Sequence, residues 1–123
     1  MNFRIKTSRR TAEKLKSLQA TTGLTWNILS RLAVGLSLRI PEIPDLVQDK
    51  NGVDIHRNAM TGEYDYVYKA LIRQHAKKNI KDEEYFPDYF NAHLERGIQF
   101  LENEYKHAGN YDKLLNNLLK INS

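Results

Sequence analysis

The sequence predicts a mainly α-helical protein in which one short strand and two helices precede two or three further helices. Apolar residues recur at spacings of three and four along most of the chain, which is typical of helices with one buried face. Apolar and polar residues alternate only at the start, over residues 2–7. The 123 residues are enough for one domain with one core. We expect a basic part at 1–40, a long connection at 41–62 and a helical part at 63–123.

The alternating stretch is expected to form a strand, with Phe3 and Ile5 on one side and Asn2, Arg4 and Lys6 on the other. So short a strand cannot stand alone. We therefore expect it to pair with the same strand of a second subunit, burying its apolar side against the helices of the dimer. The basic side would then project from a two-stranded ribbon that fits a DNA groove. Alternatively, these bases only protect a strand edge from aggregation.

Two helices follow the strand. Ser8 is a suitable N-cap for a helix over 9–22, and Gly23 can end it in the left-handed conformation. Thr25 is the next N-cap candidate, and Pro41 follows a second helix over 26–38. Its apolar residues cover more than half of the circumference, so we expect this helix to be central or to lie in a subunit interface. We interpret Trp26 as a core aromatic. Strand, helix and helix in this order indicate a ribbon-helix-helix-like unit.

The rest of the chain is predicted to be irregular at first and then helical. Val53-Asp54-Ile55 can form a short strand after a turn at Asn51-Gly52, within a connection that is either a binding segment or a simple connector. Helices are expected over 62–78, from Pro87 to His107, and over 109–121. Gly97 inside the second of these indicates a close helix approach.

Positive charge is concentrated in the first forty residues. They hold eight bases and one acid, Glu13, for a net charge of +7, whereas residues 41–123 carry a net charge of −3. Such polarity favours a polyanionic partner, and nucleic acid above all. The alternative is a solvated surface. The candidate DNA-binding residues are Arg4, Lys6, Arg9, Arg10, Lys14, Lys16, Thr25, Asn27 and Arg31. Thr25 and Asn27 are included because amides at a helix start can receive a phosphate.

Several functions are disfavoured by composition. The chain has no cysteine, which excludes a thiolate nucleophile or a Cys-ligated metal, and no two of its four histidines have the spacing of a helical zinc site. We expect no metal, no cofactor and no catalytic residue. Most of the seven tyrosines have helical spacing, which favours packing over base stacking. With neither a signal peptide nor an apolar run of membrane-spanning length, we expect a cytoplasmic protein.

Several motifs, in order and spacing, resemble the DndE family of DNA sulfur modification proteins. The resemblance covers about residues 3–106. The motifs are Phe3-Arg4-Ile5, Leu15-Lys16, Thr22-Gly23-Leu24-Thr25 with Asn27, Leu29, Arg31 and Ala33, Leu36-Ser37-Leu38, Asn51-Gly52, Gly62-Glu63-Tyr64-Asp65, Tyr68 with Ala70-Leu71 and Arg73-Gln74, and Ala92-His93-Leu94 with Arg96-Gly97. The chain departs from the family at Trp26, where proline is usual, and at Ser30, where cysteine is frequent.

The resemblance implies a role in DNA phosphorothioation, in which sulfur replaces a non-bridging phosphate oxygen. It implies a small accessory subunit that binds duplex DNA, nicked duplex above all, and does not itself transfer sulfur. It also implies a homo-oligomer, at least a dimer and plausibly a tetramer. The implied partners are a cysteine desulfurase, an iron–sulfur protein and an ATPase-like protein.

Three other functions stay open at this point. A ribbon-helix-helix transcription regulator or antitoxin would read bases with Asn2, Arg4 and Lys6 and would prefer one operator. A protein–protein scaffold would dock an acidic partner on the basic face. A nicking enzyme would cleave supercoiled plasmid in the presence of metal.

Overall fold

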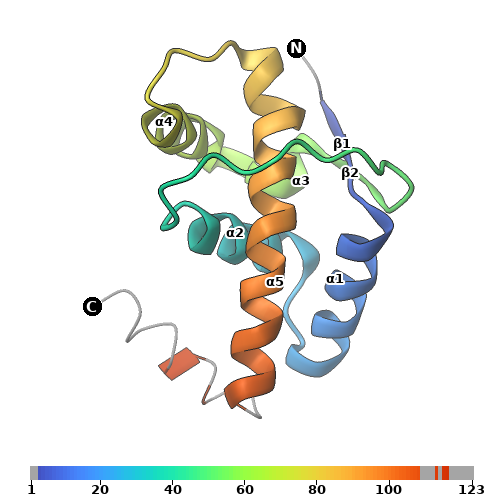
Figure 1. The fold of residues 1–123 in the computed structure, drawn as a ribbon. Helices are drawn as coiled ribbons and strands as arrows, with labels where there is room; N and C mark the ends of the chain where they lie inside the picture. Colours follow the sequence, from blue (N-terminus) through green and yellow to red (C-terminus); the bar gives the residue numbers. More distant parts are fainter. Residues whose placement is uncertain (1–2, 109–112, 114, 117–123) are drawn as a thin grey trace.

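A computed structural model of the chain describes residues 3–108, 113, 115 and 116. The elements are β1 (Arg4–Lys6), α1 (Arg9–Thr22), α2 (Trp26–Ser37), β2 (Asp54–His56), α3 (Arg57–Thr61), α4 (Asp65–Ala76) and α5 (Phe90–Ala108). A 3-10 turn, η1 (Gly62–Tyr64), precedes α4, and a helical stretch kinked at Phe86, η2 (Glu84–Tyr89), precedes α5. The mainly helical fold and the strand-helix-helix start are confirmed (Figure 1). Among the described residues, no helix is both long and apolar enough to cross a bilayer.

The two strands form one antiparallel ribbon within the chain. Arg4 is paired with His56, Ile5 with Ile55 and Lys6 with Asp54. The expectation that β1 pairs with a second subunit is therefore wrong, because the strand expected around Val53–Ile55 supplies its hydrogen-bond partners. Of the two residues expected to be buried, Ile5 is inaccessible whereas Phe3 is 55% exposed. Asn2, expected on the outer side, lies outside the described residues.

The two N-terminal helices begin and end as their local signals predict. Ser8 caps α1 by accepting a hydrogen bond from the Thr11 amide, and Gly23 follows the helix with a φ of 77°. The buried side of α1 is formed by Thr11, Ala12, Leu15 and Leu18. The predicted central place of α2 is confirmed, since this helix contacts α1, α3 and α5.

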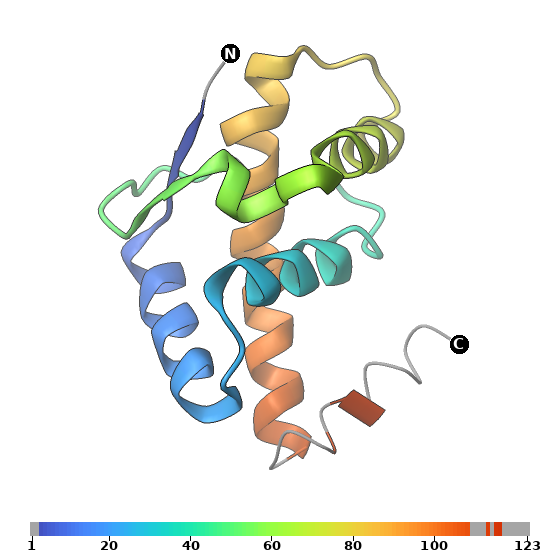
Figure 2. The ribbon, with the colours of Figure 1, turned by 180° about the vertical axis from the view of Figure 1, so that it is seen from behind.

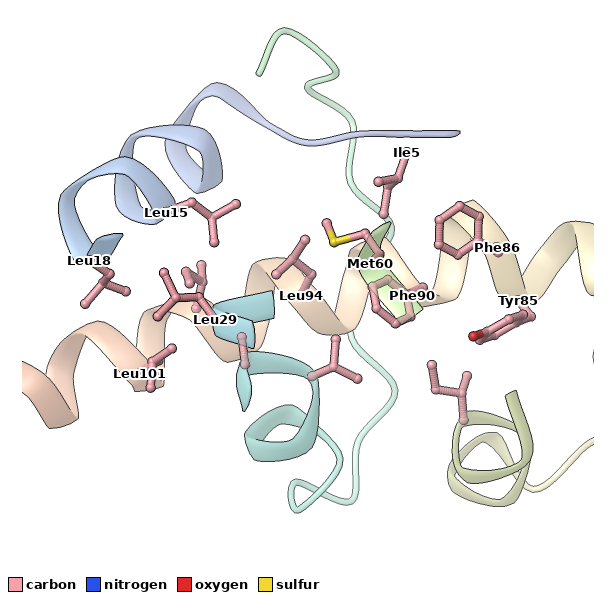
Figure 3. Packing of buried hydrophobic residues seen from close by; sticks show 14 of the residues in the cluster. Ile5, Leu15, Leu18, Leu29, Met60, Tyr85, Phe86, Phe90, Leu94 and Leu101 are labelled. Atoms are coloured by element: carbon pink, nitrogen blue, oxygen red, sulfur yellow. The ribbon is translucent and has the colours of Figure 1, made fainter. Parts of the chain in front are cut away.

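Helices α2 and α5 cross at the centre of the molecule, where α5 lies in front of α2 in Figure 1 and behind it in Figure 2. A Cβ atom at Gly97 would lie 1.6 Å from the carbonyl oxygen of Ala33. Only glycine lets the two backbones approach so closely, and the close approach expected at this position is confirmed. Buried side chains from both helices continue the core outward to Leu15 and Leu18 at one end and to Ile5, Tyr85 and Phe86 at the other (Figure 3).

The later helices differ in part from the prediction. The helix expected over 62–78 is the turn η1 followed by α4, which ends at Lys77 with a φ of 58°. The helix expected from Pro87 is present: the backbone is extended at Phe86 and helical after it, so the last residues of η2 run directly into α5. Tyr85 is fully buried, but Tyr64 and Tyr66 are exposed. The helix expected over 109–121 lies outside the described residues apart from residues 113, 115 and 116.

Candidate nucleic-acid interface

Strand β1 and helix α1 follow one another along one side of the molecule (Figure 1). Residues 4–22 carry six bases and one acid. The alternation of β1 turns Arg4 and Lys6 outward while Ile5 is buried. The apolar stripe of α1 faces the core, which leaves its basic residues on the outer and lateral sides. We call this strip of β1 and α1 the basic edge.

Three bases of the basic edge are exposed and make neither an ion pair nor a side-chain hydrogen bond among the described residues, namely Lys6, Arg9 and Lys16. Arg9 and Lys16 are seven residues apart on α1, so they lie on the same side of the helix about 10 Å apart along its axis. The backbone amide of Arg9 donates to the Asp49 carboxylate at 2.9 Å. This hydrogen bond and one from the Asn51 amide lower the pKa of Asp49.

The other bases of the basic edge have partners inside the chain. Arg4 Nε lies 2.8 Å from Asp54 Oδ1 across the ribbon, in an exposed ion pair. Arg10 Nη2 donates to Gln99 Oε1 of α5 at 2.6 Å. Lys14 Nζ lies 2.6 Å from Glu102 Oε1, also on α5, and this hydrogen bond lowers the pKa of Glu102. Lys14 therefore helps to attach α1 to α5.

The start of α2 lies beside α1 on the face seen in Figure 2. Thr25 is the N-cap residue, but its side chain makes no capping hydrogen bond and instead contacts the Asn27 amide oxygen. The side chain of Thr25 thus does not occupy the first-turn amides of α2. Farther along the helix, Arg31 is half-buried and its Nε donates to the carbonyl oxygen of Met60 in α3 at 2.8 Å.

Two acidic side chains, Asp65 and Asp82, form ion pairs with Arg57. Arg57 is buried, and its guanidinium donates to both Asp65 and Asp82 at 2.7–3.0 Å. Its hydrogen bonds lower the pKa of Asp82 and raise that of Arg57. Lys69 also forms an ion pair with Asp82, with Nζ 3.1 Å from Oδ1. These charges join the start of α3 to α4 and to the turn before η2, and they form a structural network.

A second polar cluster joins α2, α4 and α5. His93 Nδ1 lies 2.9 Å from the Ser37 hydroxyl, and the rings of His93 and His75 meet edge to face at 4.8 Å. Burial, with His75 and Arg96 nearby, lowers the pKa of His93 to about 3. Ser37 and His93 are fully buried, so this serine–histidine pair is closed to a substrate. No local pattern in the sequence indicates this cluster, because its members come from separate elements and Ser37 and His93 are 56 residues apart.

No group of three or more histidine, cysteine, aspartate or glutamate side chains that could hold a metal ion occurs in the part of the chain that the structure describes. The arrangement that remains for a ligand is the basic edge beside the first turn of α2. Exposed guanidinium and ammonium groups on one side of a helix can bind phosphates as point charges.

Comparison with known proteins gives a family and two similar structures. The family described as DNA sulphur modification protein DndE matches residues 4–109. The structure of DndE from Escherichia coli B7A, involved in DNA phosphorothioation modification, has 24% identity and a TM-score of 0.65, covering 80% of this chain and 96% of that chain. The structure of a glycine-to-lysine mutant of DndE, also involved in DNA phosphorothioation, has 24% identity and a TM-score of 0.63, covering 84% and 99%.

At this identity the two structures establish likeness of fold alone. No curated protein sequence matches the chain significantly. The family match is of a different kind, because it runs from the first residue of β1 to the end of α5 and so includes both central helices and the basic edge. Since that match spans residues 4–109, the chain belongs to the DndE family of DNA sulphur modification proteins.

Proposed function

We propose that this chain is a DNA-binding accessory subunit of the DNA phosphorothioate modification machinery and binds duplex DNA through backbone contacts. The observation that carries the proposal is the basic edge, where Lys6, Arg9 and Lys16 are exposed without an ion pair among the described residues. The first turn of α2, at Thr25 and Asn27, adds backbone amides next to this edge. Arg10 extends it, because its described side-chain partner is the neutral Gln99.

Backbone binding has a characteristic salt dependence. Each phosphate neutralised by a lysine or arginine releases condensed counterions, so log K falls linearly with log salt at a slope of about −0.9 per contact. Contacts of this kind do not read sequence. We therefore expect an affinity that depends strongly on salt and little on base sequence.

The experiment compares nicked and intact duplexes of one sequence in a gel-shift titration at low salt. We expect binding to both duplexes and tighter binding to the nicked one. A break in the DNA backbone lowers the free energy needed to bend the duplex toward the basic edge. Equal affinity for the two duplexes would contradict the nick preference. Absence of binding to either at low salt would overturn the proposal as a whole.

A matched pair of variants tests the assigned surface. Arg9→Gln with Lys16→Gln should weaken binding for all sequences and reduce the magnitude of the salt slope by about two. Lys81→Gln is the control, because Lys81 is exposed but lies between α4 and α5, away from the basic edge. An unchanged slope in the double variant, or an equal effect of the control, would place the DNA elsewhere.

The rival function as a ribbon-helix-helix regulator is less well supported. In that function the outward residues of the ribbon read bases, whereas Arg4 is paired here with Asp54 of the facing strand. A selection on random duplexes would distinguish the two functions, since a regulator prefers its operator by about 10³-fold or more. A non-catalytic role, a cytoplasmic location and a homo-oligomeric state belong to the same proposal.

A further inference from the structure

The segment that connects α2 to β2, residues 38–53, crosses α5 in Figure 1. We call it the strap. Arg96 of α5 holds its beginning, since Nη1 donates to the Glu42 carbonyl at 2.6 Å and Nη2 to the Ile40 carbonyl at 3.4 Å. It also holds the end of α2, where Nη2 donates to the Ser37 carbonyl and Nε to the Ser37 hydroxyl, both at 2.8 Å. A guanidinium engaged in this way fixes the direction in which the strap leaves α2.

The far end of the strap is fixed as well. The Gly52 amide donates to the Thr7 carbonyl at 2.8 Å, and the Thr7 amide donates to the Val53 carbonyl at 3.0 Å. A Cβ atom at Gly52 would lie 2.2 Å from the Ser8 carbonyl oxygen, so the strap and the chain before α1 are in backbone contact. With both ends held, the middle of the strap is an ordered surface and not a loose connector.

The middle of the strap alternates between buried and exposed apolar residues. Pro44 and Val47 are buried, whereas Ile43 is 47% exposed and Leu46 is 53% exposed. Two large aliphatic side chains held toward solvent on an ordered segment are unfavourable for an isolated molecule. Together they offer apolar contact area to another protein.

A groove of about 670 Å³ lies beside these residues, between the start of α1, the strap and α5. Four carboxylates line it, namely Glu42, Asp45, Asp49 and Glu95. Two guanidinium groups, Arg10 and Arg96, also line it and donate to neutral partners, so the lining carries a net charge of −2. The groove therefore combines apolar contact area with an excess of negative charge.

We propose that this groove binds a segment of another protein of the DNA sulphur modification system, and that the segment carries lysine or arginine residues beside apolar ones. Its apolar side chains would pack on Ile43 and Leu46, and its basic side chains would face the carboxylates. The proposal uses the family membership but does not depend on DNA binding: the groove borders the basic edge at Arg10, but its carboxylates and Ile43 are not part of that edge.

The two other occupants fit the groove less well. DNA is disfavoured because four carboxylates would repel its phosphates. A second copy could offer the basic edge of α1, but the apolar residues of α1 are already buried in its own core. That edge has no apolar side chains with which to cover Ile43 and Leu46.

Photocrosslinking in the full chain tests the proposal. The photoreactive residue p-benzoylphenylalanine replaces Leu46 in one variant and Tyr66, which is 72% exposed on α4, in the control. Each variant is expressed together with the other proteins of the modification system, and the cross-linked peptides are identified by mass spectrometry. We expect the probe at position 46 to label a basic, apolar segment of one of these proteins, and the control probe to leave that segment unlabelled.

Charge reversal in the same chain then tests complementarity. Asp45→Lys with Glu95→Lys should lower the yield of this cross-link by about tenfold, because like charges would face each other. Asp88→Lys is the control for charge alone. Neither Asp45 nor Glu95 makes a described ion pair, so the variant should fold, which circular dichroism would verify.

Cross-links only to a second copy, only to DNA or to no molecule would overturn the proposal, as would a yield that charge reversal leaves unchanged. A gel shift of the same charge-reversed variant separates the two proposals. If the wild type does not bind DNA but the cross-link forms and responds to charge, only the DNA-binding proposal fails. If DNA binding is intact and the cross-link is absent, only the groove proposal fails.

Discussion

Gly97 and Ala33 bring the two central helices into backbone contact, and a single added methyl group tests this contact. Gly97→Ala would place a Cβ atom 1.6 Å from the Ala33 carbonyl oxygen, so α2 and α5 would have to separate. We expect a loss of about 3 kcal/mol in the free energy of unfolding, the upper end for overpacking. The measurement is urea denaturation followed by circular dichroism.

Gly35 provides the matched control for that substitution. It is exposed within α2, and a Cβ atom there would meet no atom within 4 Å. Gly35→Ala should therefore raise the free energy of unfolding, by up to about 1 kcal/mol, through helix propensity alone. Equal effects of the two substitutions would show that α2 and α5 are not in close contact.

A single residue, His93, also predicts how the stability of the fold depends on pH. Its pKa is lowered to about 3 in the fold, below the ordinary value of 6.5. Between these values the unfolded chain binds a proton that the folded chain does not, so stability falls as the pH falls. The slope should approach about 1.4 kcal/mol per pH unit below pH 6.

Urea denaturation at pH 7, 6 and 5 measures this slope. The range lies above the titration of ordinary carboxylates, near pH 4, so their contribution is small there. His93→Gln removes the titrating group and should flatten the curve, while its amide can still reach the Ser37 hydroxyl. A curve that keeps the wild-type slope in this variant would rule out His93 as the source.

At the scale of elements, Arg57 connects α3 to α4 and to the turn before η2. Arg57→Met would leave Asp65 and Asp82 without their main counter-charge in a partly buried place. We expect a loss of about 3–5 kcal/mol in the free energy of unfolding. Arg4→Met removes the exposed ion pair with Asp54 and should cost less than about 1 kcal/mol. Chemical denaturation of both variants distinguishes the two kinds of ion pair, and similar costs would contradict a structural role for the network.

Local signals and distant contacts differ in how far the sequence predicts them. The ends of α1 follow from Ser8 and Gly23, because capping depends on a few neighbouring residues. The pairing of β1 with β2 does not follow, although both strands were expected, because periodicity carries no information about the partner. The same limit hides the Arg57 network and the hold of Arg96 on the strap, since each joins side chains from separate elements.

At the scale of the whole molecule, the net charge of +4 is the sum of a basic edge and an acidic remainder. Among the bases of that edge, Lys14 is mostly buried against Glu102, whereas Lys16 is exposed. The sequence could not separate these two lysines, since both lie on α1 and only the position of α5 distinguishes them.

Lys14→Gln and Lys16→Gln should therefore have different consequences. We expect Lys16→Gln to reduce the magnitude of the salt slope of DNA binding by about one and to leave stability unchanged. Lys14→Gln should leave the slope unchanged and lower the unfolding midpoint slightly, because the contact between α1 and α5 is weakened. Fluorescence anisotropy with labelled duplex at several salt concentrations measures the slopes, and interchanged results would exclude this division of roles.

The self-contained ribbon also determines when the chain can fold during synthesis. Arg4 meets Asp54 across a separation of 50 residues, and Ser37 meets Arg96 across 59. A nascent chain that has released only α1 and α2 has neither the second strand nor the long helix that covers its apolar surface. We expect ribosome-stalled chains to become resistant to brief proteolysis only after residue 108 has emerged from the ribosome. Resistance in chains from which β2 has not yet emerged would contradict this order. Until then the newborn chain carries the apolar sides of both helices uncovered and depends on the ribosome surface or chaperones to stay soluble.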